Sequence, residues 1–274
     1  MSGEAPEPLI PPADPAVLVI LPTYNEADTL AEVVIRALTA VPHANLLIID
    51  DASNDGTGAI AEVLARQDPR VTTLHRPGKL GLGTAYVTGF AHACERGYRW
   101  VVEMDADGSH LPEELPELLR EAQRGAGLVI GARWVPGGRI EGWSRHRRWV
   151  SRTGTRIARV ALKSRLHDAT SGYRVIDTRW LGRIELGRIT AQGYGFQIET
   201  AWILERHGCP VTETPITFVE RRAGRSKMTL GIAIEALRLI VRWGWHLRTA
   251  PDRLPALRAV PARSTREATP PTAR

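Results

Sequence analysis

The chain has 274 residues, of which 43% are hydrophobic and 24% are charged, and it carries a formal net charge of +6. This is enough apolar material for a large folded domain. No stretch of about 18 residues is free enough of charge to cross a membrane as a helix, so the composition excludes an integral membrane protein and favours a globular protein of enzyme size.

The first 130 residues predict strands that alternate with helices. Short apolar runs predict the strands, and apolar residues at helical spacing predict the helices between them. The expected strands are 17–21, 46–49, 71–74 and 100–104, and the expected helices are 30–41, 57–66 and 84–96. Because strands joined through helices pair in parallel, we expect an α/β fold: a Rossmann-like α/β/α sandwich with a mostly parallel central sheet.

The second half predicts fewer strands and longer helices. A strand at 128–131 precedes helices near 148–162 and 197–206, a strand at 211–219 and a long apolar helix over 230–247. Pro, Ala, Arg and Thr supply 19 of the last 25 residues, a composition that cannot bury a core. We therefore expect a flexible tail over 1–15, a folded domain over 16–229, an amphipathic helix over 230–248 and a disordered tail over 249–274.

Charge is divided unevenly between the two halves. Residues 1–130 hold 9 basic and 19 acidic side chains, whereas residues 131–274 hold 27 basic and 11 acidic ones. Within the second half, Gly131 to Arg165 contains ten basic residues and the single acid Glu141. Such a segment attracts an anionic ligand, a nucleic acid or an anionic lipid surface. With two cysteines and no signal-like start, the protein is expected in the cytoplasm.

Acidic residues follow three of the predicted strands. Glu26 follows the first, Asp51 the second, and Asp105 and Asp107 the fourth. The carboxyl ends of parallel strands meet at one edge of a sheet, which is where ligands bind. Two carboxylates separated by one residue suit Mg²⁺ or Mn²⁺, which can also bridge substrate phosphates. The acids therefore favour a site for a metal and a nucleoside diphosphate.

Eight segments, in order between residues 16 and 247, resemble one enzyme family. They are Pro22-Thr-Tyr-Asn-Glu26; Ile49-Asp-Asp51 with Ser53 and Asp55-Gly-Thr57; Leu80 to Tyr86; Met104-Asp-Ala-Asp-Gly-Ser-His110 with Pro112; Gly131-Ala-Arg133 with Gly137 and Gly138; Thr170-Ser-Gly-Tyr-Arg174; Gly193-Tyr194 with Phe196 to Glu199; and Phe218-Val-Glu-Arg221 with Gly224, Ser226 and Lys227. In this order they resemble the inverting family 2 glycosyltransferases of GT-A fold, and among them the polyprenol (dolichol) phosphate mannosyltransferases.

The resemblance implies a GT-A catalytic domain that moves mannose from GDP-mannose to a polyprenyl phosphate, giving a β-mannosyl phosphoryl polyprenol. The donor residues implied are Pro22, Tyr24, Glu26, Ile49 and Asp51 around the guanosine, and Asp105, Ala106, Asp107, Arg221 and Lys227 around the metal and diphosphate. The acceptor phosphate residues implied are Arg133, Arg147 and Ser151. The implied catalytic set is Asp105 and Asp107 with these three acceptor residues.

The metal site departs from the family in one residue. Some relatives have a glutamine two positions after the second aspartate, where this chain has Ser109. We therefore include Ser109 with Asp105 and Asp107 as a candidate metal ligand. A related enzyme that uses UDP-glucose or UDP-GlcNAc is the alternative for the donor.

The chemistry expected of the residues agrees with this resemblance. A lipid phosphate is already ionised at neutral pH, so it needs positioning more than a general base. The departing nucleotide gains negative charge, which a metal ion and cationic side chains stabilise. A nucleic-acid-binding module and an inactive scaffold are the alternatives from other classes. The acids at the strand ends argue against the first, and we expect no nucleic acid partner.

The helix over 230–248 has an apolar side beside a basic stripe. Arg238, Arg242 and His246 recur every four residues, and Trp243 and Trp245 lie near its end. One interpretation places this helix in the headgroups of an anionic membrane surface, on the cytoplasmic face, as a peripheral anchor. The other packs it on the catalytic domain with its tryptophans in the core. A membrane-embedded partner protein is a further candidate for the anchor.

Overall fold

A computed structural model describes residues 17–189, 194–221 and 230–249, and its central element is a seven-stranded sheet. The strand order is β3-β2-β1-β4-β7-β5-β8. The strands are β1 (Val17–Thr23), β2 (Asn45–Asp50), β3 (Val71–His75), β4 (Trp100–Glu103), β5 (Leu128–Ala132), β7 (Arg174–Asp177) and β8 (Val211–Pro215). All pairs are parallel except those of β7, which runs antiparallel to both neighbours. The expected α/β fold with a mostly parallel sheet is confirmed.

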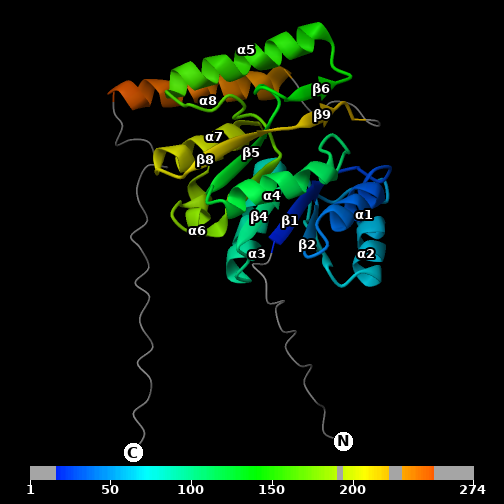
Figure 1. Ribbon diagram of the computed structural model, residues 1–274. Helices are drawn as coiled ribbons and strands as arrows, with labels where there is room; N and C mark the ends of the chain where they lie inside the picture. Colours follow the sequence, from blue (N-terminus) through cyan, green and yellow to red (C-terminus); the bar gives the residue numbers. More distant parts are fainter. Residues whose placement is uncertain (1–16, 190–193, 222–229, 250–274) are drawn as a thin grey trace, which may run out of the picture.

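Helices cover both faces of this sheet (Figure 1). On one face lie α1 (Leu30–Ala40), α2 (Thr57–Gln67) and α4 (Leu115–Gln123), and on the other lie α3 (Leu82–Glu95), α6 (Thr178–Leu181) and α7 (Tyr194–Arg206). Helices α5 (Arg145–Leu162) and α8 (Leu230–Thr249) lie side by side at one end of the molecule, near the small two-stranded sheet of β6 (Arg139–Glu141) and β9 (Thr217–Val219).

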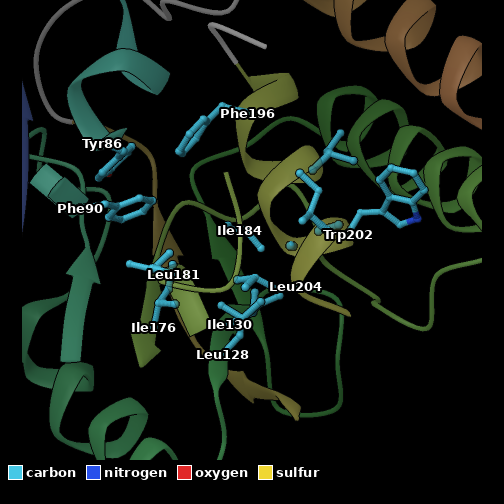
Figure 2. Close-up of a cluster of buried hydrophobic side chains, with 14 of the residues drawn as sticks. Tyr86, Phe90, Leu128, Ile130, Ile176, Leu181, Ile184, Phe196, Trp202 and Leu204 are labelled. Carbon is cyan, nitrogen blue, oxygen red and sulfur yellow. The ribbon is translucent and has the colours of Figure 1, made fainter. Parts of the chain in front are cut away.

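The central strand β1 shows why the sequence forms three layers. Its side chains alternate between the faces of the sheet, because successive residues of a strand point in opposite directions. Leu18 and Ile20 join the core beneath α3 and α7, whereas Val19 and Leu21 join the core beneath α1 and α4. A strand buried on both faces therefore reads as a continuous apolar run. Figure 2 shows part of the first core, where Phe196 packs against Tyr86 and Phe90.

The predicted strand at 211–219 is wrong in one respect, because it divides into β8 and β9. Pro215 has no amide hydrogen with which to continue the ladder. Ile216 is buried in the core, and the chain then leaves the main sheet to pair with β6. The antiparallel strand β7 was not predicted from the sequence. It places Arg174 directly opposite Glu103 of β4.

Helix α8 packs on the domain, as one interpretation predicted, but it also has an exposed tryptophan, as expected of a helix at a membrane surface. Gly244 lies so close to α5 that an added Cβ would stand 2.8 Å from the Ala161 carbonyl oxygen. Trp243 is 4% exposed and stacks on Trp202 of α7, with ring centroids 6.0 Å apart. Trp245 is 67% exposed. One tryptophan is therefore in the core and the other on the surface.

Candidate active site

The acids predicted at strand ends lie at one edge of the sheet. Strands β2, β1 and β4 are parallel neighbours, so the loops that follow them start side by side. These loops carry Asp51, Glu26 and the Asp105 to Asp107 turn. The Thr29 hydroxyl donates to the Ala106 carbonyl at 2.7 Å and ties the first loop to the third.

Two non-glycine residues in these loops adopt left-handed backbone conformations. Asn25 has φ 56° and Ala52 has φ 54°, a region that side chains with a Cβ rarely occupy. Hydrogen bonds between the loops hold them there: the Asn25 amide donates to the Ser53 hydroxyl at 2.9 Å, and the Asn54 amide donates to the Asn25 side chain at 3.1 Å. Strain of this kind persists at binding sites where surrounding contacts fix the backbone.

Asp51 is a buried carboxylate that organises the loop before α3. Its Oδ2 accepts the amides of Leu80 and Gly81, each at 3.1 Å, and its Oδ1 pairs with Arg76 at 3.1 Å. On the same side of the edge, the Lys79 ammonium lies 4.1 Å from the ring centre of Tyr24. Arg76 and Lys79 were not among the predicted site residues, because their partners Asp51 and Tyr24 belong to other loops.

Asp107, the second acid of the predicted metal pair, forms an ion pair with Arg221, a predicted donor residue. Asp107 is buried, and its Oδ2 lies 3.0 Å from a guanidinium nitrogen of Arg221, 114 positions later in the chain. Burial by itself would raise the pKa of Asp107, but the charge of Arg221 and the hydrogen bond from the Ser109 amide hold that pKa below its usual value. The Ser109 hydroxyl also donates to Asp107 and lowers its pKa in the same direction.

The buried ring of His110 packs beside the turn that carries Asp105 and Asp107. Its Nδ1 accepts the Asp105 amide at 3.1 Å, so the neutral ring carries its proton on Nε2. The ring stacks on Tyr173 and meets Phe218 edge to face. Burial lowers the pKa of His110 to about 4, so the ring is uncharged at neutral pH.

A cavity of about 220 Å³ opens beside Asp105 and brings together the predicted acceptor residues and part of the predicted donor and metal residues. Asp105, Ser109, Arg133, Arg147, Ser151 and Arg221 all line it. Apolar side chains from several helices form much of the remaining wall, among them Leu82, Val150, Ile198 and Ile240. The cavity therefore combines an acidic corner, cationic groups and an apolar lining.

Arg133 lines this cavity, but its guanidinium is engaged with Asp168. The two side chains form a bidentate pair with distances of 2.8 and 2.7 Å, and Arg133 also donates to the Thr170 hydroxyl at 2.8 Å. Both residues are buried. The sequence did not predict this ion pair, because Asp168 lies 35 positions after Arg133.

Arg147 and Ser151 lie one turn apart on α5 and face the cavity. The Ser144 hydroxyl accepts the Arg147 amide and so caps the start of α5. The Arg147 guanidinium lies 4.1 Å from the ring centre of Trp143 and pairs with Glu220 at 2.7 Å. Lys227, predicted to contact the donor phosphates, lies outside the described residues, as do the tail predicted over 1–15 and, except for Thr249 at the end of α8, the tail predicted over 249–274.

Comparison with known proteins identifies the family. Residues 18–184 match the family described as Glycosyl transferase family 2. The chain belongs to this family. An undecaprenyl-phosphate mannosyltransferase of Micrococcus luteus is 49% identical over 232 residues, which cover 85% of this chain and 95% of that protein. A polyprenol monophosphomannose synthase of Mycolicibacterium smegmatis is 46% identical over 228 residues, or 83% of this chain and 86% of that protein.

Solved structures show the same fold as this family 2 glycosyltransferase. Glucosyl-3-phosphoglycerate synthase from Mycobacterium tuberculosis, in complex with phosphoglyceric acid, superposes with a TM-score of 0.62 at 20% identity, over 85% of this chain and 81% of that one. The same enzyme in complex with Mn²⁺, UDP-glucose and phosphoglyceric acid gives a TM-score of 0.61 at 20% identity, with the same coverage of the two chains. The expected GT-A fold is confirmed.

The glycosyltransferase has a second notable surface, formed by the outer sides of α5 and α8. Large apolar side chains are exposed there: Trp149, which is 67% exposed, Val150, Ile157 and Val160 on α5, and Val241 and Trp245 on α8. The same two helices carry exposed arginines at positions 145, 148, 152, 156, 238 and 242. In the described part of the chain, no helix is long and apolar enough to cross a membrane.

Proposed function

We propose that this glycosyltransferase transfers mannose from GDP-mannose to a polyprenyl phosphate with inversion, giving a β-mannosyl phosphoryl polyprenol. The observation that carries the proposal is the cavity beside Asp105. It holds cationic groups suited to phosphate next to an apolar wall suited to an isoprenoid chain. The names of the two relatives from Micrococcus luteus and Mycolicibacterium smegmatis support mannose and a polyprenyl phosphate.

We assign the donor nucleotide to the loops at the carboxyl edge of the sheet. Pro22, Tyr24, Glu26, Ile49 and Asp51 would surround the guanosine. The buried Asp51 carboxylate and the loop amides that it binds fix the shape of this region before ligand arrives. Loops that are already fixed in shape lose less conformational freedom when a nucleoside binds, which favours binding.

The acidic turn fits a divalent metal ion, Mg²⁺ or Mn²⁺. Asp105 and Asp107 offer hard oxygen ligands, and the buried Ser109 hydroxyl lies within hydrogen-bond reach of Asp107. No group of three or more His, Cys, Asp or Glu ligands occurs in the described parts of the chain, so these two carboxylates would need the substrate diphosphate to complete the coordination. When bound, the ion would supply positive charge to the leaving diphosphate.

The remaining steps use the chain's own residues. Arg147 and Ser151 would hold the acceptor phosphate, whose ionised oxygen attacks the sugar carbon opposite the leaving group. No general base is required, because this oxygen carries no proton to remove. Arg221, already paired with Asp107 at 3.0 Å, would stabilise charge on the departing GDP, together with Lys227. Arg133, which is bound to Asp168, would add its charge to the acceptor side and hold the cavity wall.

The outer sides of α5 and α8 would rest on an anionic membrane on its cytoplasmic face. Exposed tryptophans favour the membrane interface, and arginines favour anionic headgroups. Trp149 and Trp245 are both exposed on this surface, close to several arginines. A peripheral contact of this kind would bring the cavity close to a lipid substrate without a spanning helix.

The test is a label-transfer experiment with two donors. Purified protein is incubated with Mg²⁺, polyprenyl phosphate and either radiolabelled GDP-mannose or radiolabelled UDP-glucose, and the label in the lipid phase is counted. We expect label from GDP-mannose, in a product whose anomeric configuration is β by NMR. Label only from UDP-glucose would refute the donor, and no label from either would refute the reaction.

A further inference from the structure

Several polar groups that line the cavity have no hydrogen-bond partner of standard geometry among the described residues. They are the Trp143 indole N–H, the Thr155 hydroxyl and the side-chain oxygen of Gln197. Buried polar groups in proteins are nearly always hydrogen-bonded, and each one left without a partner destabilises the fold. A cavity with several of them is built for a ligand that carries its own hydrogen-bonding groups.

The Gln197 amide borders an open space beside the acidic turn. Gly172, on the opposite wall, has no side chain, and a Cβ built there would lie 3.6 Å from Gln197 Nε2, 3.7 Å from His110 Cε1 and 3.8 Å from Asp105 Oδ1. One added methyl group would therefore touch all three residues. These distances define a small space between an amide, a neutral ring and a carboxylate of the predicted metal pair.

A buried arginine fixes the position of Gln197. The Arg174 guanidinium donates to the carbonyls of Gln197, Ser171 and Ala169, each at 2.8 Å. It thereby ties the start of α7 to the loop that contains Gly172. The backbone that carries the Gln197 side chain is therefore fixed at the cavity wall before any ligand binds.

The chemistry of this space discriminates between the ligand groups of the reaction. Asp105 is on its border, and the Gln197 side-chain nitrogen donates to the buried Glu103 carboxyl, whose pKa burial raises to about 7. An acidic neighbourhood disfavours a phosphate, and an isoprenoid chain has no hydrogen-bonding groups for the amide. A neutral group with several hydroxyls satisfies both conditions.

We propose that Gln197 binds hydroxyl groups of the transferred hexose, in the space that Gly172 leaves open beside Asp105. This inference rests on the proposed function, because it places the sugar of the donor next to the residues assigned to its diphosphate. Gln197 is then a specificity-determining residue, and Gly172 is required because any side chain would occupy the volume of the sugar.

Two variants test the proposal, with calorimetric affinities for GDP-mannose and for GDP as the readout. Gln197→Ala removes the amide, and Gly172→Ala adds a methyl group that makes only ordinary contacts in the free protein, at 3.6 Å or more. We expect each variant to bind GDP-mannose about tenfold more weakly, because the first removes a hydrogen bond to the sugar and the second fills part of its space. Affinity for GDP should stay within about twofold, since GDP has no sugar to place there.

Thr200→Val is the matched control. Thr200 is on the same helix as Gln197, is equally buried and also has a hydroxyl without a partner of standard geometry among the described residues, but it does not line the cavity. This variant should keep the preference of the wild type for GDP-mannose over GDP. A melting curve for each variant reports whether the fold is kept.

The outcomes separate the inference from the proposed function. If Gln197→Ala and Gly172→Ala keep the wild-type preference for GDP-mannose over GDP, the inference is overturned, and Gln197 serves only to support Glu103. If the wild type binds and transfers glucose from UDP-glucose instead, the proposed donor is wrong. The same variants, measured with UDP-glucose against UDP, then decide whether the space binds the hexose.

Discussion

Replacing Arg147 and Arg221 one at a time should separate the two substrates of the reaction. Arg147 projects from α5 beside Trp143, and Arg221 follows β9 and pairs with Asp107. Both side chains line the same cavity, yet we assign one to the acceptor phosphate and the other to the donor diphosphate. Arg147→Ala should therefore raise the KM for polyprenyl phosphate, and Arg221→Ala should weaken use of GDP-mannose.

The size of each effect follows from exposure. A charge-assisted hydrogen bond to phosphate contributes about 1.5 to 3 kcal/mol. The Arg147 side chain is 34% exposed, so solvent screening limits the cost of removing it to about 1.5 kcal/mol, or about tenfold in KM. The Arg221 side chain is 17% exposed, so removing it should cost about 3 kcal/mol, or somewhat more than 100-fold in kcat/KM for the donor.

The assay measures initial rates while one substrate is varied at a time. A short-chain polyprenyl phosphate in detergent removes any contribution from binding to a membrane. Arg156→Ala is the control, because Arg156 is an exposed arginine of α5 that does not line the cavity. If both variants impair both substrates by the same factor, the assignment of the two arginines to different substrates is wrong.

Three further predictions concern the metal pair, the membrane surface and the buried ion pair. Asp107→Ala should abolish transfer while the circular dichroism spectrum is kept, and EDTA should act on the wild type in the same way; activity within about twofold would contradict a metal role. Arg238→Glu with Arg242→Glu should release the protein from anionic vesicles at low salt without changing GDP affinity, and normal pelleting would contradict anchoring through α8. Asp168→Asn should lower the free energy of unfolding by about 3 kcal/mol, because it leaves the buried Arg133 without a counter-charge; an unchanged urea midpoint would contradict this.

The carboxyl edge of the sheet could be predicted from the sequence because its signal is local. A strand such as β1 is a continuous apolar run that ends in polar residues, and the acids of three loops follow such runs directly. Parallel pairing then brings the loops together with no further information. The edge that carries Asp51, Glu26 and Asp105 follows from this reasoning.

The partners of the cationic residues could not be predicted in this way. Asp168 binds Arg133 over 35 positions, and β7 enters the sheet antiparallel and sets Arg174 opposite Glu103, 71 positions earlier. These contacts depend on the tertiary fold, because nothing in the local sequence says which arginine meets which acid. The same applies to Gln197, because the sequence places it in a family-like segment but does not say that it lines the cavity or meets Glu103.

Helix α5 connects the cavity with the proposed membrane surface through its own geometry. Residues three, four or seven positions apart share one side of a helix, so Arg147, Ser151 and Gly154 face the cavity, while Trp149, Arg152 and Arg156 lie on the opposite side. A helix with its side chains is about 10 to 12 Å across. If the outer side rests on headgroups, the acceptor phosphate must therefore move about one helix diameter out of the headgroup layer to reach Arg147. Val150 lies between these two sides, where it is exposed at the surface and also lines the cavity. The apolar path for the lipid chain would then run past Val150, and the membrane contact and the acceptor site would depend on the same helix.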